Sequence, residues 1–324
     1  MIEYAIPPGL TAPLPADGRG SVVTVGTFDG VHRGHREVLH EIVRRGERTG
    51  RRSVLATFHP HPLRIVRPEA APPLLTTPAE KKRVLTESGI EYAVFIPFTR
   101  VLQRYSADRF VEEILVQRLG MEELVVGYDH GFGRGREGDV ETMRELGRRL
   151  GFAVDVVEAV EIEAGAISST RIRRAVAEGN VEAAREGLGR PYSLQGTVVR
   201  GDGRGRSLGF PTANIQVPAA DKLIPGSGVY AVFGTVGERR LPGLIHLGPR
   251  PTFAGAAPSV ELHLLDFDEE LYGRTVGVEF IARLRGVTAF ASPGELVAQL
   301  QRDAAQGRRI LDQARRVVAG AGRC

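Results

Sequence analysis

The stretch that constrains the fold most runs from residue 22 to residue 35 and reads VVTVGTFDGVHRGH. Its first four residues are all β-branched and predict a buried strand, and the three glycines after them predict a turn. Glycine allows positive φ and lets backbone N–H groups approach a ligand that a Cβ would hold off. Apolar residues at helical spacing follow and stop at Gly50, so we expect a helix that begins near His32.

A strand, turn and helix in this order predict a phosphate site. The N-terminus of the helix would present free N–H groups and a partial positive charge to an anion. His32 and His35 are three residues apart, so both can face one ligand and donate hydrogen bonds to phosphoryl oxygens. A pair of satisfied surface histidines is the alternative that the residues leave open. The glycine spacing fits neither a Walker loop nor a dinucleotide fingerprint.

Composition sets broad limits on the kind of protein. A chain of 324 residues with 42% hydrophobic and 25% charged residues fits two globular domains. The net charge of +4 comes from 43 basic against 39 acidic residues, which fits anionic substrates as well as nucleic acid. The single cysteine, Cys324, excludes an intramolecular disulfide. We expect no signal peptide and no membrane span, and a cytoplasmic location.

The first half of the chain alternates between predicted strands and predicted helices. We expect a parallel sheet with helices on both faces, since such an alternation is typical of α/β folds. The strand that begins at Ser53 ends at His59-Pro60-His61-Pro62, where the prolines force an exit from regular structure. X-Pro geometry makes the two histidines diverge, so a loop that lines the nucleotide pocket is favoured over a metal pair.

Two further stretches of this half carry candidate ligand contacts. The glycine-rich residues 127–139 follow a predicted strand, and ligands bind at that edge of an open α/β sheet, so Asp129 is a candidate for a ribose or flavin contact. A flexible basic loop is the alternative. Ser168 or Ser169 can cap the next helix, where Thr170 and Arg173 lie in the first turn. Arginine at the positive end of a helix is unfavourable, which indicates that an anion binds there.

After residue 187 the pattern changes to short strands, which predict a small antiparallel barrel, followed by a helix from Ser292. The loop of residues 201–209 offers Gly201, Gly205 and Arg206 to a phosphate chain. Thr212 and Asn214 offer a hydroxyl and an amide oxygen, and such hard ligands suit magnesium. Ordinary turn chemistry is the alternative for this pair.

Glu261 is the candidate base of the second half. It lies between Val260 and Leu262, so strand alternation places Glu261 on one face and the two apolar side chains on the other. If the apolar face packs outward under helices, Glu261 faces the mouth of the barrel and can act as a general base. If it does not, Glu261 is an ordinary solvent-facing charge.

The motifs resemble a known family over nearly the whole chain. GTFDGVHRGH, GYDHGFGRGREGD and ISSTRIR, within residues 15–187, look like the FMN adenylyltransferase half of bacterial bifunctional riboflavin kinase/FAD synthetases. GRSLGFPTANI, GVYAV and VELHLLDFDEELYG, within residues 190–316, resemble the riboflavin kinase half. Departures from the family pattern are Thr27 and His246, where Asn is common, His130 in place of Phe, and Gly286-Val287 in place of Pro-Glu.

The resemblance implies a Rossmann-like nucleotidyltransferase domain at residues 1–187 and a β-barrel kinase domain with a terminal helix at residues 188–324. It implies that Thr212 and Asn214 bind MgATP and that Glu261 deprotonates the ribityl 5′-hydroxyl. The residues that it places on the ATP-handling motifs of the first domain are Gly26, Phe28, His32, His35, Ser168, Thr170 and Arg173, of which His32, His35 and Arg173 would be catalytic.

We therefore expect a fused enzyme that phosphorylates riboflavin to FMN and adenylylates FMN to FAD, with ATP as co-substrate and Mg²⁺ as cofactor. The alternatives are a chain with one degenerate half and a non-catalytic flavin- or nucleotide-binding protein. A nucleic-acid partner is not expected, because only 6% of the residues are aromatic and there is no Trp. The sequence does not predict the oligomeric state.

Overall fold

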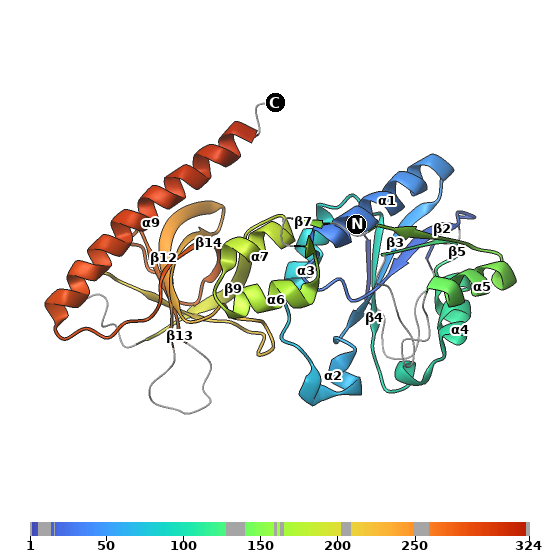
Figure 1. Ribbon diagram of the computed structural model, residues 1–324, viewed down its shortest axis with the longest axis horizontal. Coiled ribbons are helices and arrows are strands. Elements are labelled where there is room, and N and C mark those ends of the chain that lie inside the picture. Colours follow the sequence, from blue (N-terminus) through green and yellow to red (C-terminus); the bar gives the residue numbers. More distant parts are fainter. Residues whose placement is uncertain are drawn as a thin grey trace. The chain divides into compact units, whose positions relative to one another are not determined.

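The computed structural model describes residues 2–5, 14–15, 17–127, 140–158, 161–162, 165–201, 209–248 and 259–321 (Figure 1). Backbone contacts divide the chain into two compact units, Met1–Ser169 and Thr170–Cys324, which we call the sheet unit and the barrel unit. The barrel unit contains the short helix α7 (Val181–Leu188) and all but the first residue of the short helix α6 (Ser169–Ala177). The sequence analysis places them in the first domain, whereas α7 packs against two barrel strands.

The sheet unit has a six-stranded sheet whose strands are all parallel, in the order β1-β4-β3-β2-β5-β6 (Figure 1). This confirms the predicted α/β class. The strands are β1 (Ile2–Ala5), β2 (Ser21–Val25), β3 (Arg52–His59), β4 (Tyr92–Pro97), β5 (Met121–Gly127) and β6 (Ala153–Val157). The helices are α1 (Arg33–Thr49), α2 (Leu63–Val66), α3 (Pro78–Thr86), α4 (Ala107–Phe110) and α5 (Val140–Leu150).

Shorter elements complete this unit. A π-helical segment (Val111–Val116) continues α4 where the sequence predicts one α-helix over residues 107–119. The edge strand β1 is not predicted from the sequence. The remaining elements are the 3₁₀ turns Pro68–Ala70 and Leu102–Arg104 and the two-stranded hairpin of β7 (Glu161–Ile162) and β8 (Gly165–Ala166).

Each face of the sheet covers its own hydrophobic core. Val22 and Leu55 pack with α1 and α3 in one cluster, whereas the adjacent Val23 and Val54 pack with α4, the π-helical segment and α5 in the other. Successive residues of a strand point to opposite faces, so a β-branched run without alternation suits a sheet that is buried on both sides. Helices therefore cover both faces, as predicted.

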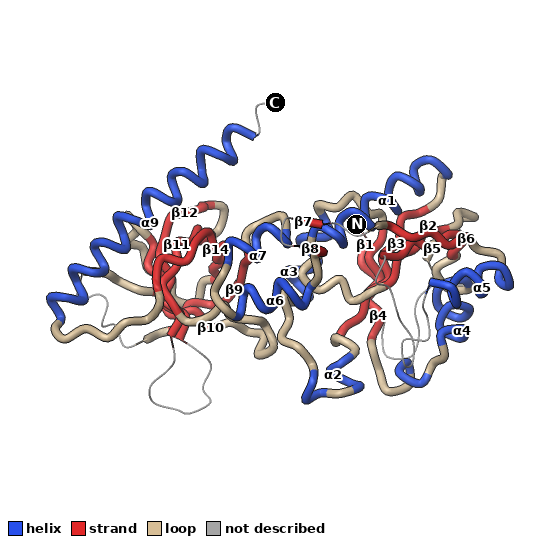
Figure 2. Tube along the Cα trace, viewed as in Figure 1, coloured by secondary structure: helices blue, strands red, loops and turns tan. Residues whose placement is uncertain are grey.

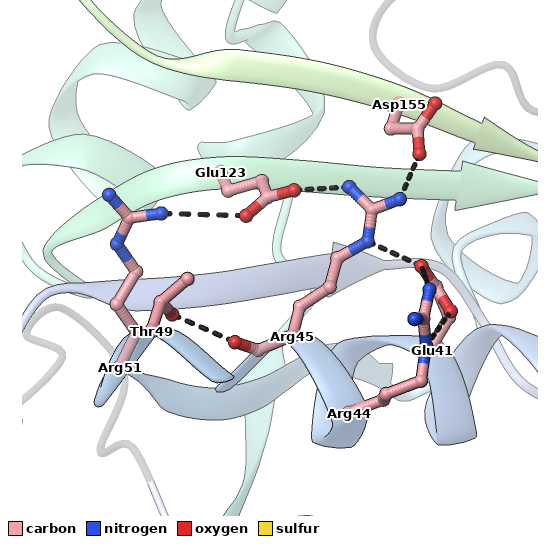
Figure 3. Close-up of polar contacts among 7 residues, drawn as sticks. All are labelled: Glu41, Arg44, Arg45, Thr49, Arg51, Glu123 and Asp155. Carbon is pink, nitrogen blue, oxygen red and sulfur yellow. Dashed lines mark hydrogen bonds and ion pairs between the residues drawn. The ribbon is translucent and has the colours of Figure 1, made fainter. Parts of the chain in front are cut away.

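A network of ion pairs attaches α1 to the sheet (Figure 3). Arg45 contacts Glu41 on its own helix at 2.5 Å, and it also pairs with Glu123 of β5 and Asp155 of β6. The side chains of Arg45 and Glu123 are only 15% and 9% exposed. Arg51 reaches the other oxygen of Glu123 at 3.5 Å. The network thus joins the C-terminal half of α1 to two neighbouring strands.

Glu41 makes this network sensitive to acid. The hydrogen bond from Arg44 lowers the pKa of Glu41 to about 2 against the opposing effect of burial, and Arg45 lowers it further. A carboxylate whose pKa is depressed in the folded state stabilises the fold above its unfolded pKa, and this stabilisation is lost as the pH falls toward the folded pKa.

We expect Glu41→Gln to lower the stability of the chain by about 1 kcal/mol at pH 7, because solvent screens part of the pairing. Between about pH 4.5 and pH 2 the difference from the wild type should disappear. Thermal unfolding of the full chain at pH 7 and pH 3 measures both. The control is Glu47→Gln at an exposed position of the same helix. An equal stability difference at both pH values would contradict the assignment.

The barrel unit is a closed barrel of six antiparallel strands in the order β10-β13-β12-β11-β14-β9, with β9 paired to β10 (Figure 2). The strands are β9 (Tyr192–Val199), β10 (Ala213–Gln216), β11 (Gly228–Val236), β12 (Arg239–Gly248), β13 (Ser259–Leu264) and β14 (Thr275–Arg285). This confirms the predicted small antiparallel barrel.

The long helix α9 (Pro293–Ala321) packs on the outside of the barrel, against β11, β12 and β14. Leu311 of α9 is fully buried in a cluster with Phe233 and Ile281. Gly307 allows the close approach of α9 to β12, since a Cβ there would lie 2.5 Å from a methyl carbon of Leu244. The predicted terminal helix is confirmed.

Candidate active sites

The turn between β2 and α1 has an unusual backbone. Phe28 and Val31 have φ of 45° and 41°, in the left-handed region that non-glycine residues rarely adopt, and Gly30 has φ of 83°. Of the three glycines in this turn, only Gly30 uses the positive φ that glycine allows. Gly26 serves another purpose, because a Cβ there would lie 3.1 Å from the Phe28 ring.

The two histidines lie together at the start of α1, as the sequence predicts. His32 is the N-cap of α1, and its Nδ1 accepts a hydrogen bond from the backbone N–H of His35 at 3.3 Å. Their rings stack with centroids 3.6 Å apart, and the His35 ring also stacks on Phe28 at 4.5 Å. The first turn of α1 contains no acidic residue. The arrangement favours an anion at this helix end.

The segment that leads into α3 clamps this turn. The buried carboxylate of Asp29 accepts hydrogen bonds from the backbone N–H groups of Leu75 at 2.9 Å and Thr76 at 3.0 Å. In return, the Thr76 hydroxyl accepts from the backbone N–H of Gly30 at 3.0 Å. Lys81 of α3 donates from Nζ to the carbonyl oxygen of Thr27 at 2.7 Å. Sequence reasoning did not single out Asp29, Leu75, Thr76 or Lys81 as site positions.

A pocket adjoins the clamped turn. His59 and His61 line it, which agrees with the interpretation of that loop as a pocket wall. The other lining residues are Thr27, Asp29, Phe58, Leu74, Thr76, Pro78, Lys81 and Phe95. Six of these ten residues are polar or charged, so the pocket beside the turn is lined mainly by polar side chains.

The structure describes only some of the other residues predicted for the first site. Ser168 is half-buried and directly precedes α6, and the hydroxyl of the next residue, Ser169, donates to the carbonyl oxygen of Asp29 at 2.9 Å. Thr170 and Arg173 belong to the barrel unit, so their roles stay predictions. Asp129 and His130 lie outside the described residues, as do Gly205 and Arg206 of the predicted kinase site.

The second candidate site is a row of polar residues across the barrel. The strand register pairs Asn214 of β10 with Glu261 of β13, and Glu261 with His246 of β12. Residues that face each other in an antiparallel pair have their side chains on the same face. The three side chains therefore form one row, although they come from distant parts of the sequence.

This row lies on the outer face of the barrel. Val260 and Leu262 are 5% and 1% exposed and point to the opposite face from Glu261, which is the inside of the closed barrel. The alternative in which the apolar face of this strand packs outward under helices is therefore wrong. Glu261 is nevertheless half-buried rather than fully exposed, and it lies between Asn214 and His246.

The surroundings of His246 affect its ionisation. Burial lowers the pKa of His246, the carboxylate of Glu261 opposes that effect, and Arg285 adds to it. The His246 ring lies over Gly248, where a Cβ would be 2.6 Å from the ring. Arg285 is held by the buried Asp303 of α9 at 2.8 Å. Burial and Arg285 therefore both favour a neutral His246 beside Glu261.

Of the two predicted metal ligands, Asn214 pairs with Glu261, and Thr212 lies just before β10. Thr212 and Asn214 are half-buried, and a Cβ at Gly201 would collide with the Asn214 amide at 2.0 Å. His263 fixes the segment before β10, because its Nδ1 donates to the Pro211 carbonyl oxygen at 2.8 Å. No cluster of three His, Cys, Asp or Glu side chains suits a metal within the described residues. Oxygen donors of this number fit Mg²⁺, which usually keeps waters and binds substrate phosphates.

Two sequence-family models match the chain, one on each half. The model described as FAD synthetase matches residues 14–171, and the model described as riboflavin kinase matches residues 188–311. A bifunctional riboflavin kinase/FMN adenylyltransferase of Escherichia coli K12 is 40% identical over 290 residues, which cover 89% of this chain and 92% of that protein. The chain belongs to this family. Each family half thus contains one of the two candidate sites.

A second relative agrees with this membership, and one solved structure shares the fold. The bifunctional riboflavin kinase/FMN adenylyltransferase of Bacillus subtilis is 34% identical, over 91% of this chain and 94% of that protein. A crystal structure described as a macrolide-efflux protein from Streptococcus pneumoniae has a TM-score of 0.82 at 31% identity, over 90% of this chain and 94% of that chain. Among the described residues, no helix has the length and apolar character to span a bilayer.

Proposed function

We propose that the barrel unit forms FMN and ADP from riboflavin and ATP, and that the sheet unit then forms FAD and pyrophosphate from FMN and ATP. As a member of its family, the chain is a transferase with a riboflavin kinase half and an FMN adenylyltransferase half. The observation that carries the first reaction is the pairing of Glu261 with Asn214 on one face of the barrel. The strained turn with two stacked histidines carries the second.

In the kinase reaction, Glu261 is the general base. The ribityl hydroxyl oxygen attacks the γ-phosphorus of ATP, its proton passes to the Glu261 carboxylate, and the bond between the γ-phosphorus and the bridging oxygen breaks to release ADP. Thr212 and Asn214 would hold Mg²⁺ together with the ATP phosphates, and the ion would neutralise charge on the transferred group. A neutral His246 leaves Glu261 free of a competing positive charge.

In the adenylyl transfer, the phosphate of FMN is the nucleophile. One of its oxygens attacks the α-phosphorus of ATP, and the bond to the pyrophosphate oxygen breaks. The nucleophile is already an anion, so the site needs no strong base, and its task is to stabilise charge and to orient the reactants. The start of α1 with His32 and His35 would bind the phosphate chain.

Several finer assignments belong to the same proposal. Mg²⁺ is the proposed metal, and riboflavin, FMN, FAD and ATP are the proposed small-molecule partners. We propose domains at residues 1–187 and 188–324, a cytoplasmic location, and no partner among nucleic acids.

Incubation of the purified chain with riboflavin and MgATP, followed by chromatography of the flavins, tests the function directly. FMN should appear first and FAD after it. FMN without FAD would show that the adenylyltransferase half is inactive. FAD formed from supplied FMN, but not from riboflavin, would show that the kinase half is inactive. Binding of flavin without turnover would contradict both proposed reactions.

Thr212→Val should weaken the magnesium–nucleotide site of the kinase, because it keeps the volume of the side chain and removes the oxygen. We expect KM for MgATP in FMN formation to rise at least about tenfold, because the loss of even an outer-shell partner of a metal ligand typically costs that much. Titration of both proteins with Mg²⁺ measures the effect. Thr197→Val at an exposed position of β9 is the control. An unchanged magnesium dependence would remove Thr212 from the site.

A further inference from the structure

Lys81 is a buried charge that the proposed chemistry does not use. The residue is 7% exposed, in the first half of α3. Burial lowers the pKa of Lys81 to about 8, while the nearby carboxylate of Asp29 acts in the opposite direction. Burial of a charged ammonium group is costly unless other groups compensate for the lost water. A lysine that stays charged at neutral pH in such a place needs groups that compensate for the lost water.

The partner of Lys81 is the turn between β2 and α1. Its Nζ donates to the carbonyl oxygen of Thr27, and the same oxygen accepts a second hydrogen bond from the Thr57 hydroxyl at 3.0 Å. On the other side of Phe28, the carboxylate of Asp29 is fixed by backbone N–H groups at Leu75 and Thr76. Two anchors therefore flank Phe28 directly.

Phe28 needs such anchors because of its backbone. A left-handed φ at a residue with a Cβ is strained, and it persists only where the surroundings fix it. The Phe28 ring stacks on His35, which in turn stacks on His32. A relaxed backbone at Phe28 would move the ring that supports both histidines. The ammonium group of Lys81 thus acts on the histidines through Thr27 and Phe28.

We propose that Lys81 is a positioning residue for adenylyl transfer, whose charged side chain holds the turn so that His32 and His35 meet the phosphate chain of ATP. The proposal rests on the FMN adenylyltransferase function proposed above. It also explains why Thr27 can replace the Asn that is common in the family, since the clamp uses the backbone oxygen of this residue and not its side chain.

Lys81→Met keeps the length and apolar stem of the side chain and removes the charge. We expect kcat/KM for FAD formation from FMN and ATP to fall about a hundredfold at pH 7, the typical result of a misplacement near 1 Å. FMN formation from riboflavin by the same sample should stay within twofold of the wild type. Arg83→Met is the matched control, because it removes a cation from an exposed position of α3.

The pH dependence separates positioning by charge from a purely structural role. Above pH 8 the wild type loses the proton of Lys81, so its advantage over Lys81→Met should shrink by about tenfold per pH unit. The other titratable groups that face Lys81 are Asp29, His59 and His61 across the pocket, with Glu80 beside it on α3. Both proteins contain these groups, so they cancel in the ratio of the two rates.

Three results would overturn the proposal. They are an unchanged rate of FAD formation in Lys81→Met, an equal loss in Arg83→Met, and a ratio of rates that stays constant from pH 7 to pH 10. If Lys81→Met does not fold, Lys81→Arg replaces it, and its FAD formation should persist above pH 9, where that of the wild type declines. A wild-type chain that forms no FAD would overturn the proposed function. A wild-type chain that forms FAD, together with any of the three results above, would overturn only the role of Lys81.

Discussion

Glu261→Gln should lower the rate of FMN formation by about a hundredfold to ten-thousandfold, the range that general-base catalysis contributes. Glutamine keeps the shape and most hydrogen bonds of glutamate, but it cannot accept the proton of the ribityl hydroxyl. The loss should appear in kcat, with little change in KM for MgATP, because the base acts in the transition state. Initial rates of FMN formation at saturating riboflavin and MgATP measure it.

The same variant has an internal control in the other unit. FAD formation from supplied FMN should persist, since its nucleophile is already ionised and its proposed turn lies in the sheet unit. From riboflavin, the variant should form almost no FAD. Glu279→Gln is the matched control, because Glu279 is a barrel glutamate that pairs with Arg240 at 2.8 Å instead of joining the polar row. Only a few-fold loss in Glu261→Gln would show that Glu261 is a structural charge.

His35→Ala should lower FAD formation from FMN by about a hundredfold to a thousandfold, the usual loss when one group that stabilises transition-state charge is removed. The variant also removes the ring that stacks between Phe28 and His32. FMN formation from riboflavin should be nearly intact. Parallel assays of the two reactions on one preparation measure both effects.

His40→Ala is the control for this prediction, because His40 is exposed on the same helix, five residues further along. Thermal unfolding of the three proteins tests whether the substitution disturbs the fold. An equal loss of both activities in folded His35→Ala would refute the separation of the two sites.

The sequence predicted local structure best where one pattern decides it. The change to short strands after residue 187 predicts the antiparallel barrel that the structure has. The β1 strand was missed because it is four residues long and lies at the edge of the sheet. The π-helical segment after α4 was missed because its apolar pattern is that of an ordinary helix.

The site residues show a similar division. Alternation placed Glu261 opposite its apolar neighbours, but only the closure of the barrel decides which face is outside. The sequence analysis does not single out Lys81, although a signal is present. Lys81, Val84 and Leu85 are three and four residues apart, and that spacing puts the lysine on the buried face of α3. Asp29 gave no such signal, because its partners Leu75 and Thr76 are 46 and 47 residues away.

The ion pairs of Arg45 have a consequence for how the sheet unit selects a single native alignment. Both faces of the central strands are apolar. A strand shifted by one residue would therefore exchange one hydrophobic face for the other. Hydrophobic burial would oppose such a slip only weakly. Arg45 distinguishes the two alignments, because only one of them brings Glu123 and Asp155 to the guanidinium group. A slip would take Glu123 and Asp155 away from a largely buried guanidinium group, which would keep only Glu41 of its own helix as a partner. These ion pairs therefore favour the native strand alignment over shifted alignments that the hydrophobic pattern alone would tolerate.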